Sequence, residues 1–193
     1  MGAPKITLYT NHGCPFAHRA HIALKETGLE YEEVIIDLNK PREPWYLEIN
    51  PVSDIAIQLL LFILLTSYDV YYEKQRGLVP TINYNGNIIP ESGIVAQFIA
   101  DAHPSHLLPP SSPVENSLYR ARVAFFIDAF FSKAIAHFWP SLRTNSQEEK
   151  DSLAEQIQAG ILKEVEPLLV EGKGPFFGGS DKLTLAEVCT FPF

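Results

Sequence analysis

The spacing of hydrophobic and polar residues changes twice in the first half of the chain. Apolar and polar residues alternate from Lys5 to Thr10, which predicts a strand, and a second β-rich segment runs from Tyr31 to Asp37. Between them, apolar side chains at helical spacing predict a helix that ends at Gly28; they belong to Phe16, Ala20, Ala23 and Leu24. A further short helix begins at Pro44. The opening pattern is therefore strand, helix, strand, helix.

The middle of the chain predicts a hairpin followed by a helix. Two short apolar segments flank Asn85-Gly86, a dipeptide that supplies the positive φ angles of a tight turn. The segment from Glu91 to His103 has one apolar face and ends before Pro104. Strands and helices together predict an α/β domain over residues 1–103.

Beyond residue 103 the pattern contains helices only. Residues 104–115 are rich in Pro and Ser and predict a linker. Long amphipathic helices are expected from Asn116 to Phe138 and from Gln147 to Val170. Thr184 to Glu187 reads TLAE, which matches a helix capping box. We therefore predict a separate all-α domain over residues 116–193.

Charge and cysteine content narrow the function classes. A formal net charge of −8 and a pI near 5.2 argue against nucleic-acid binding, which needs a basic face. Cys14 and Cys189 are too few for a disulfide framework or a cysteine metal site, which favours a reducing compartment. The first residues lack the pattern of a secretory signal, so we expect a cytoplasmic protein without a membrane partner.

The candidate chemistry lies at Cys14, in the turn that precedes the first helix. Free backbone amides and the helix dipole at that point favour an anion, and hence the thiolate. A buried, inert cysteine is the alternative. Ala17 stands where a dithiol enzyme has its second cysteine, so no resolving thiol is at hand. The nearby His12, His18 and His21 show no metal-ligand spacing, and we predict no metal.

Four motifs in order along the chain carry a family resemblance: CPFAHR from Cys14, LVP from Leu78, ESGIVAQFI from Glu91 and FFGGSDKLTLAE from Phe176. Together they resemble the cytosolic glutathione transferases, particularly the omega and fungal cysteine-type classes. The resemblance implies a thioredoxin-like glutathione-binding domain followed by a helical domain. It also implies a homodimer that uses glutathione as co-substrate.

The resemblance assigns roles to particular residues. Cys14 becomes the catalytic nucleophile, and the residues expected to bind glutathione are Phe16, Lys40, Val79, Pro80, Glu91 and Ser92. Pro80 would be a cis-proline that presents the Val79 backbone to the cysteinyl part of glutathione. Glu91 and Ser92 would meet its γ-glutamyl carboxylate, and Lys40 its glycyl carboxylate. Simpler interpretations stay open: a trans proline, a serine that only caps its own helix, and a solvated lysine.

The expected activity is glutathione-dependent thiol transfer through a mixed disulfide at Cys14. The acceptor would be a glutathionylated thiol, a small disulfide, dehydroascorbate or a small electrophile, with only weak conjugation. The alternative is a non-catalytic module of the same fold that serves in assembly or regulation.

Residues 52–75 interrupt the family pattern and contain the apolar run LLLFILLT. A helix over the most apolar part, Ile55 to Leu65, would be about 16 Å long, too short for a hydrocarbon core of about 30 Å. A surface helix with no polar face and a translated intron are the other interpretations, and we favour the intron. Family members also continue past the capping box, so we expect apolar surface on the two long helices. The expected consequence is a chain of low stability or without activity.

Overall fold

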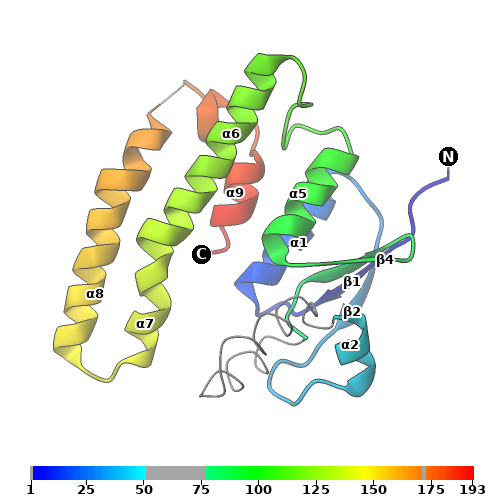
Figure 1. Ribbon diagram of the computed structural model, residues 1–193, viewed down its shortest axis with the longest axis horizontal. Helices are drawn as coiled ribbons and strands as arrows, with labels where there is room; N and C mark the ends of the chain where they lie inside the picture. Colours follow the sequence, from blue (N-terminus) through cyan, green and yellow to red (C-terminus); the bar gives the residue numbers. More distant parts are fainter. Residues whose placement is uncertain (1, 51–76, 171–172) are drawn as a thin grey trace, which may run out of the picture. The chain divides into compact units, whose positions relative to one another are not determined.

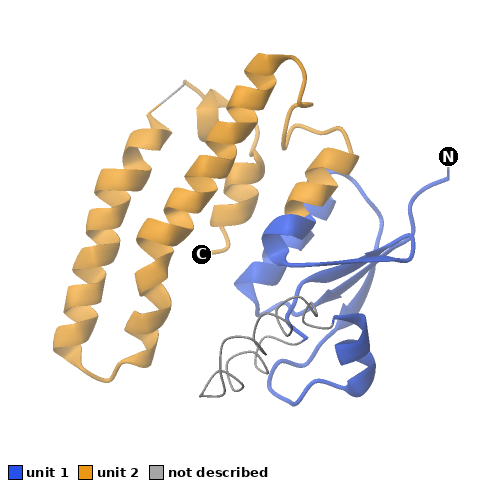
Figure 2. Cartoon of the chain, in the orientation of Figure 1, with its two compact units in different colours: residues 1–95 blue, residues 96–193 orange. Residues whose placement is uncertain are grey.

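The computed structural model describes residues 2–50, 77–170 and 173–193. The chain forms two compact units, Met1–Val95 and Ala96–Phe193 (Figure 2). The division falls inside helix α5 (Ser92–Ala102). The expected domain limits at residues 103 and 115 stay predictions.

A four-stranded mixed sheet organises unit 1 (Figure 1). The strand order is β2-β1-β3-β4, with β1 parallel to β2 and antiparallel to β3, and β3 antiparallel to β4. A parallel pair needs a crossover connection, which α1 supplies between β1 and β2. The strands are β1 Ile6–Thr10, β2 Glu32–Ile35, β3 Thr81–Tyr84 and β4 Asn87–Pro90.

The β3–β4 hairpin turns at Asn85 and Gly86, as the sequence predicts. Their φ angles are 51° and 88°, the positive values that the turn requires. The turn is also tied to β1, because the backbone N–H of Lys5 donates to Asn85 Oδ1 at 2.8 Å. The hairpin is thereby fixed against the centre of the sheet.

Helices α1 and α2 of unit 1 begin at prolines, and α1 packs mainly through small side chains. Pro15 and Pro44 occupy the first positions of α1 (Pro15–Glu26) and α2 (Pro44–Ile49), where the missing N–H costs nothing. The inner face of α1 is fully buried and consists of Ala17, Ala20, Ala23 and Leu24. Such small side chains let α1 pack closely against neighbouring elements of unit 1.

Unit 2 contains the two long helical segments that the sequence predicts, although neither is a regular α-helix throughout. α6 (Val114–Ala129) continues as a π-helical turn, η1 (Phe130–Ala134), then η2 (Ile135–His137) and α7 (Phe138–Arg143). α8 (Gln147–Gly160) continues through η3 (Ile161–Val165) and η4 (Glu166–Leu169).

The two long segments touch at Gly160. A Cβ atom at that position would lie 2.1 Å from the backbone oxygen of Lys133 in η1. A glycine is therefore what permits this close approach of the two backbones.

The short helix α9 (Leu185–Thr190) follows η5 (Phe177–Gly179), and all six of its residues are buried. Its capping box is confirmed: Thr184 and Glu187 satisfy each other's backbone amides. Glu187 also accepts a hydrogen bond from the backbone N–H of Phe177 at 2.8 Å, and the Phe177 ring packs on Phe126 of α6, 4.8 Å between centroids. The predicted linker also contributes to unit 2, because Leu107 is fully buried and its carbonyl accepts from the Leu185 N–H.

The expected apolar surface on the long helical segments is confirmed. Phe125 and Leu118 of α6 are each 60% exposed, and Leu162 and Leu169 are more than half exposed. In the described part of the chain, the helices are too short or too polar to cross a bilayer. Residues 52–75, with the apolar run 59–66, lie outside the described residues.

Candidate active site around Cys14

Cys14 is the N-cap residue of α1. Its carbonyl accepts the first bond of the helix, from the N–H of Ala17 at 3.0 Å, and its thiol faces the Val79 carbonyl, with Sγ and O 3.9 Å apart. The side chain is partly exposed, whereas Cys189 is 2% exposed. A partly accessible sulfur at a helix N-terminus is what a thiolate nucleophile needs. The burial that the inert alternative requires is therefore found at Cys189 and not at Cys14.

Asn11 fixes the turn that carries Cys14, a role not foreseen from the sequence. Its Oδ1 accepts from the Gly13 N–H at 2.9 Å, and its backbone carbonyl accepts from the Cys14 N–H at 3.1 Å. Its Nδ2 donates to the carbonyl of Ile36 at 2.9 Å. The first of these contacts is an Asx turn, so an Asn three residues before the cysteine was the available signal.

The peptide bond between Val79 and Pro80 is cis, which confirms that expectation. The preceding carbonyl, of Leu78, accepts from Tyr46 Oη at 2.7 Å and from Asn50 Nδ2 at 3.0 Å. Burial raises the pKa of Tyr46, so the hydroxyl remains a donor at neutral pH. α2 thus holds the segment that faces the thiol.

Glu91 and Ser92 lie at the N-terminal end of α5. Glu91 has a φ of 70°, a left-handed conformation that is costly for a residue with a side chain and concentrates at functional sites. Ser92 Oγ accepts a hydrogen bond from Arg19 Nη1 at 2.9 Å, and both residues are less than 10% exposed. The Arg19 guanidinium also lies 5.5 Å from the centre of the Phe16 ring. Arg19, which the sequence analysis did not select, therefore links α1 to α5 and contacts Phe16.

Lys40 lies in the loop between β2 and α2 of unit 1. It is 79% exposed and forms an ion pair with Asp37, 3.1 Å between Nζ and Oδ2. The Asn39 backbone N–H and then Lys40 lower the pKa of Asp37, so that carboxylate stays charged. The Arg42 guanidinium stabilises the loop by donating hydrogen bonds to the carbonyls of Asp37, Lys40 and Gly77.

This loop borders a pocket of about 330 Å³, lined among others by Ile36, Lys40, Trp45 and Tyr46. The structure therefore brings Cys14 and Val79 into contact and joins Ser92 to α1. Lys40 lines the pocket, and its side chain pairs with Asp37. All of the expected site residues that the structure describes belong to unit 1.

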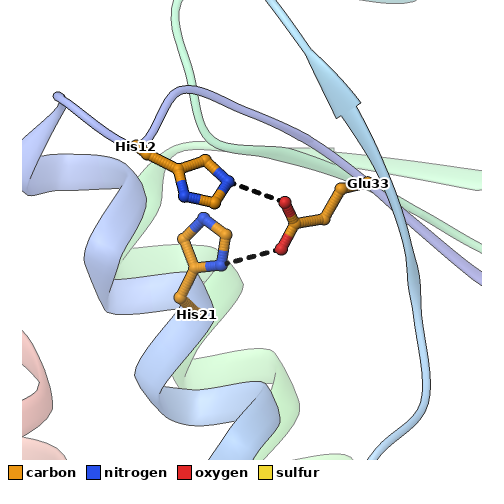
Figure 3. A group of neighbouring side chains, drawn as sticks. All are labelled: His12, His21 and Glu33. Carbon is orange, nitrogen blue, oxygen red and sulfur yellow. Dashed lines mark hydrogen bonds and ion pairs between the residues drawn. The ribbon is translucent and has the colours of Figure 1, made fainter.

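A second polar group lies beside the turn of Cys14. The potential ligand atoms of His12, His21 and Glu33 all lie within 4.8 Å of one another (Figure 3). Sequence spacing showed no metal pattern because the carboxylate comes from β2 and the histidines from the turn and from α1. The arrangement can hold a metal ion, which the sequence analysis did not foresee.

Comparison with known proteins identifies the relatives of this chain. The family profile described as "Glutathione S-transferase, N-terminal domain" matches residues 13–102. Rat glutathione S-transferase omega-1 is 26% identical over 98% of this chain and 66% of its own length. The chain thus spans slightly less than two thirds of that relative.

Solved structures of glutathione transferases are also similar to this chain. A rice glutathione transferase in complex with glutathione superimposes with a TM-score of 0.75 at 27% identity, over 98% of this chain and 74% of that one. The omega 2C glutathione transferase of Trametes versicolor gives a TM-score of 0.64 at 30% identity, over 98% of this chain and 72% of its own. The fold is a thioredoxin-like N-terminal part followed by a helical part.

Proposed function

The chain belongs to the glutathione transferase family, in its omega-type branch, and from this premise we propose that it is a glutathione-dependent thiol transferase with Cys14 as nucleophile. The observation that carries the proposal is the placement of the Cys14 sulfur. It is partly exposed at the N-terminus of α1 and faces the carbonyl of Val79.

In the first step the Cys14 thiolate attacks the glutathionyl sulfur of a mixed disulfide between glutathione and a substrate thiol. A sulfur–sulfur bond forms between Cys14 and glutathione, and the substrate leaves as a thiolate that takes a proton from water. Ala17 is fully buried and carries no thiol, so the chain has no neighbouring cysteine at that position to resolve the adduct.

In the second step the thiolate of a free glutathione attacks the glutathionyl sulfur of the adduct. Oxidised glutathione leaves and the Cys14 thiolate is restored. A small disulfide would first exchange with glutathione, giving a free thiol and a glutathione mixed disulfide that enters the same cycle. With dehydroascorbate, the Cys14 thiolate would add to a carbonyl carbon, and a glutathione thiolate would then attack the Cys14 sulfur, releasing ascorbate and leaving the Cys14–glutathione disulfide for the second step. In each case two glutathione molecules supply the two electrons. Conjugation of electrophiles is expected to be slow, because Cys14 forms a disulfide with glutathione instead of activating its thiol.

Glutathione would bind along the groups already described. The Val79 backbone, beside the cis bond to Pro80, would pair with the cysteinyl unit. The N-terminus of α5, with Glu91 and the Ser92 hydroxyl, suits the γ-glutamyl carboxylate. Lys40 would meet the glycyl carboxylate, and Phe16 would line the site beside Cys14. We further propose a cytoplasmic homodimer.

The test is turnover of a glutathionylated peptide with glutathione as reductant, followed in the full chain and in Cys14→Ser. We expect a loss of more than about 100-fold in kcat/KM, together with loss of the glutathione adduct seen by intact mass spectrometry. Cys189→Ala is the matched control, because it removes the other thiol, and it should keep both the activity and the adduct.

Two results would contradict the proposal. An unchanged rate in Cys14→Ser would remove the assigned nucleophile. An inactive full chain that shows a cooperative unfolding transition but forms no adduct would instead favour the non-catalytic module.

A further inference from the structure

We propose that His12, His21 and Glu33 form a binding site for one divalent metal ion of the zinc type. The three residues come from the turn after β1, from α1 and from β2, so a bound ion would join three elements of unit 1 (Figure 3). Two imidazoles and one carboxylate are a common ligand set for zinc, with a fourth position left for water or another ligand.

The distances fit such an ion. Zinc bonds to nitrogen and oxygen ligands are about 2.0–2.1 Å long, which places tetrahedral ligand atoms about 3.3 Å apart. In the structure, His21 Nδ1 lies 3.4 Å from Glu33 Oε1, and His12 Nε2 lies 2.7 Å from Glu33 Oε2. The two imidazole centroids are 5.2 Å apart. Because 2.7 Å is shorter than the spacing of two ligand atoms on one ion, His12, which is 66% exposed, would move away from Glu33 to admit it.

His21 is already oriented as a ligand. Its Nε2 lies 2.7 Å from the hydroxyl oxygen of Thr10, a fully buried residue of β1. When Nε2–H donates to that oxygen, Nδ1 keeps its lone pair, which faces both the Tyr31 hydroxyl at 3.3 Å and Glu33 Oε1 at 3.4 Å, so an ion would replace the contact with Tyr31. Metal-bound histidines regularly donate their second nitrogen in this way, which fixes the ring and its tautomer.

The charges of the group also suit a cation. Glu33 supplies a carboxylate, and His12 and His21 supply imidazole nitrogens, so a bound divalent ion would be only partly neutralised by its protein ligands.

The test is titration of the tag-free full chain with Zn²⁺ by isothermal calorimetry at neutral pH, and with Co²⁺ by visible absorption. We expect one equivalent to bind. Glu33→Gln and His21→Gln should each weaken binding by at least about tenfold. The matched control is Glu32→Gln, because adjacent residues of a strand point to opposite faces, and it should bind like the unmodified chain.

The thiol is the competing ligand, so the same titrations are made on Cys14→Ser. Retained binding in Cys14→Ser, with loss in Glu33→Gln, supports the site. Binding that disappears in Cys14→Ser, or that persists unchanged in Glu33→Gln and His21→Gln, would overturn it. If the full chain does not bind Zn²⁺, the three residues form only a hydrogen-bonded cluster and the proposal is wrong. Circular dichroism of each variant shows that the fold is retained.

Discussion

The two units differ in where their buried polar side chains come from. In the described part of unit 1, such side chains belong to four separate elements, β1, α1, β3 and α5, and they are Thr10, Arg19, Thr81 and Ser92. In the described part of unit 2 they lie within one short stretch, the helix α9 and its cap, and they are Thr184, Glu187 and Thr190.

This difference separates two uses of a buried hydrogen bond. The Arg19–Ser92 bond connects elements that are far apart in the sequence, and it helps to hold the N-terminus of α5 where we propose that glutathione binds. The bonds of Glu187 satisfy neighbouring amides and allow α9 to be buried. The Arg19–Ser92 pair in unit 1 links distant elements, whereas Thr184 and Glu187 in unit 2 cap the start of one buried helix.

The largest effect on stability is expected from Glu187→Ala in unit 2. The substitution leaves the buried backbone amides of Phe177 and Thr184 without their carboxylate partner, and each such loss costs about 1–3 kcal/mol. We expect the free energy of unfolding to fall by about 2–6 kcal/mol in urea denaturation. Glu187→Gln keeps one acceptor oxygen and should lose less.

An exposed glutamate provides the control for that experiment. Glu155 lies in α8, where all residues are described and none is buried, and Glu155→Ala should change stability by less than about 0.5 kcal/mol. Equal losses in Glu155→Ala and Glu187→Ala would remove the special role of the capping box.

A smaller effect, confined to unit 1, is expected from Ser92→Ala. It removes a buried acceptor from a charged donor, a bond worth about 1.5–3 kcal/mol. The variant should also show a raised KM for glutathione, because α5 loses its tie to α1. Ser92→Thr restores a hydroxyl and should recover most of both losses. A stability loss without any change in KM would show that Ser92 is structural only.

The smallest expected effect is a dependence of stability on pH, which arises from residues of unit 1. In the folded chain the pKa of His21 lies below its ordinary value because burial desolvates the ring. As pH falls below about 6.5, the imidazole of the unfolded chain therefore binds a proton more readily than that of the folded chain, and the free energy of unfolding decreases. Glu33, whose pKa is also lowered, acts in the same direction at lower pH, since its contribution is present above its ordinary pKa and disappears as it is protonated.

Thermal unfolding followed between pH 7 and 5 measures this dependence. His21→Gln should make the decline shallower, whereas His137→Gln, a histidine of unit 2, should leave it unchanged. A decline that is just as steep in His21→Gln would assign the acid sensitivity elsewhere.

Features set by residues close in sequence could be predicted. Asn85-Gly86 gave the hairpin, Thr184 with Glu187 gave the capping box, and the turn before Pro15 placed Cys14 at a helix N-terminus. In each case the residues that carry the signal also make the structure, so no knowledge of distant contacts was needed.

Features that depend on the pairing of distant residues could not be predicted. Arg19 and Ser92 lie 73 positions apart, and nothing near either residue indicates the other. Glu33 meets His12 and His21 because β2 pairs in parallel with β1 in one particular register, which sequence spacing does not reveal. The π-helical turns η1 and η3 likewise follow no local pattern that we recognise.

The contact at Gly160 limits which substitutions the two long helical segments of unit 2 can accept. Exposed positions along them, such as Phe125 and Leu162, have room for side chains of many sizes. At position 160 even one methyl group would meet the oxygen of Lys133 and force the backbones apart. In a library of random substitutions, functional survivors should vary freely at the exposed positions of both segments and retain glycine at position 160.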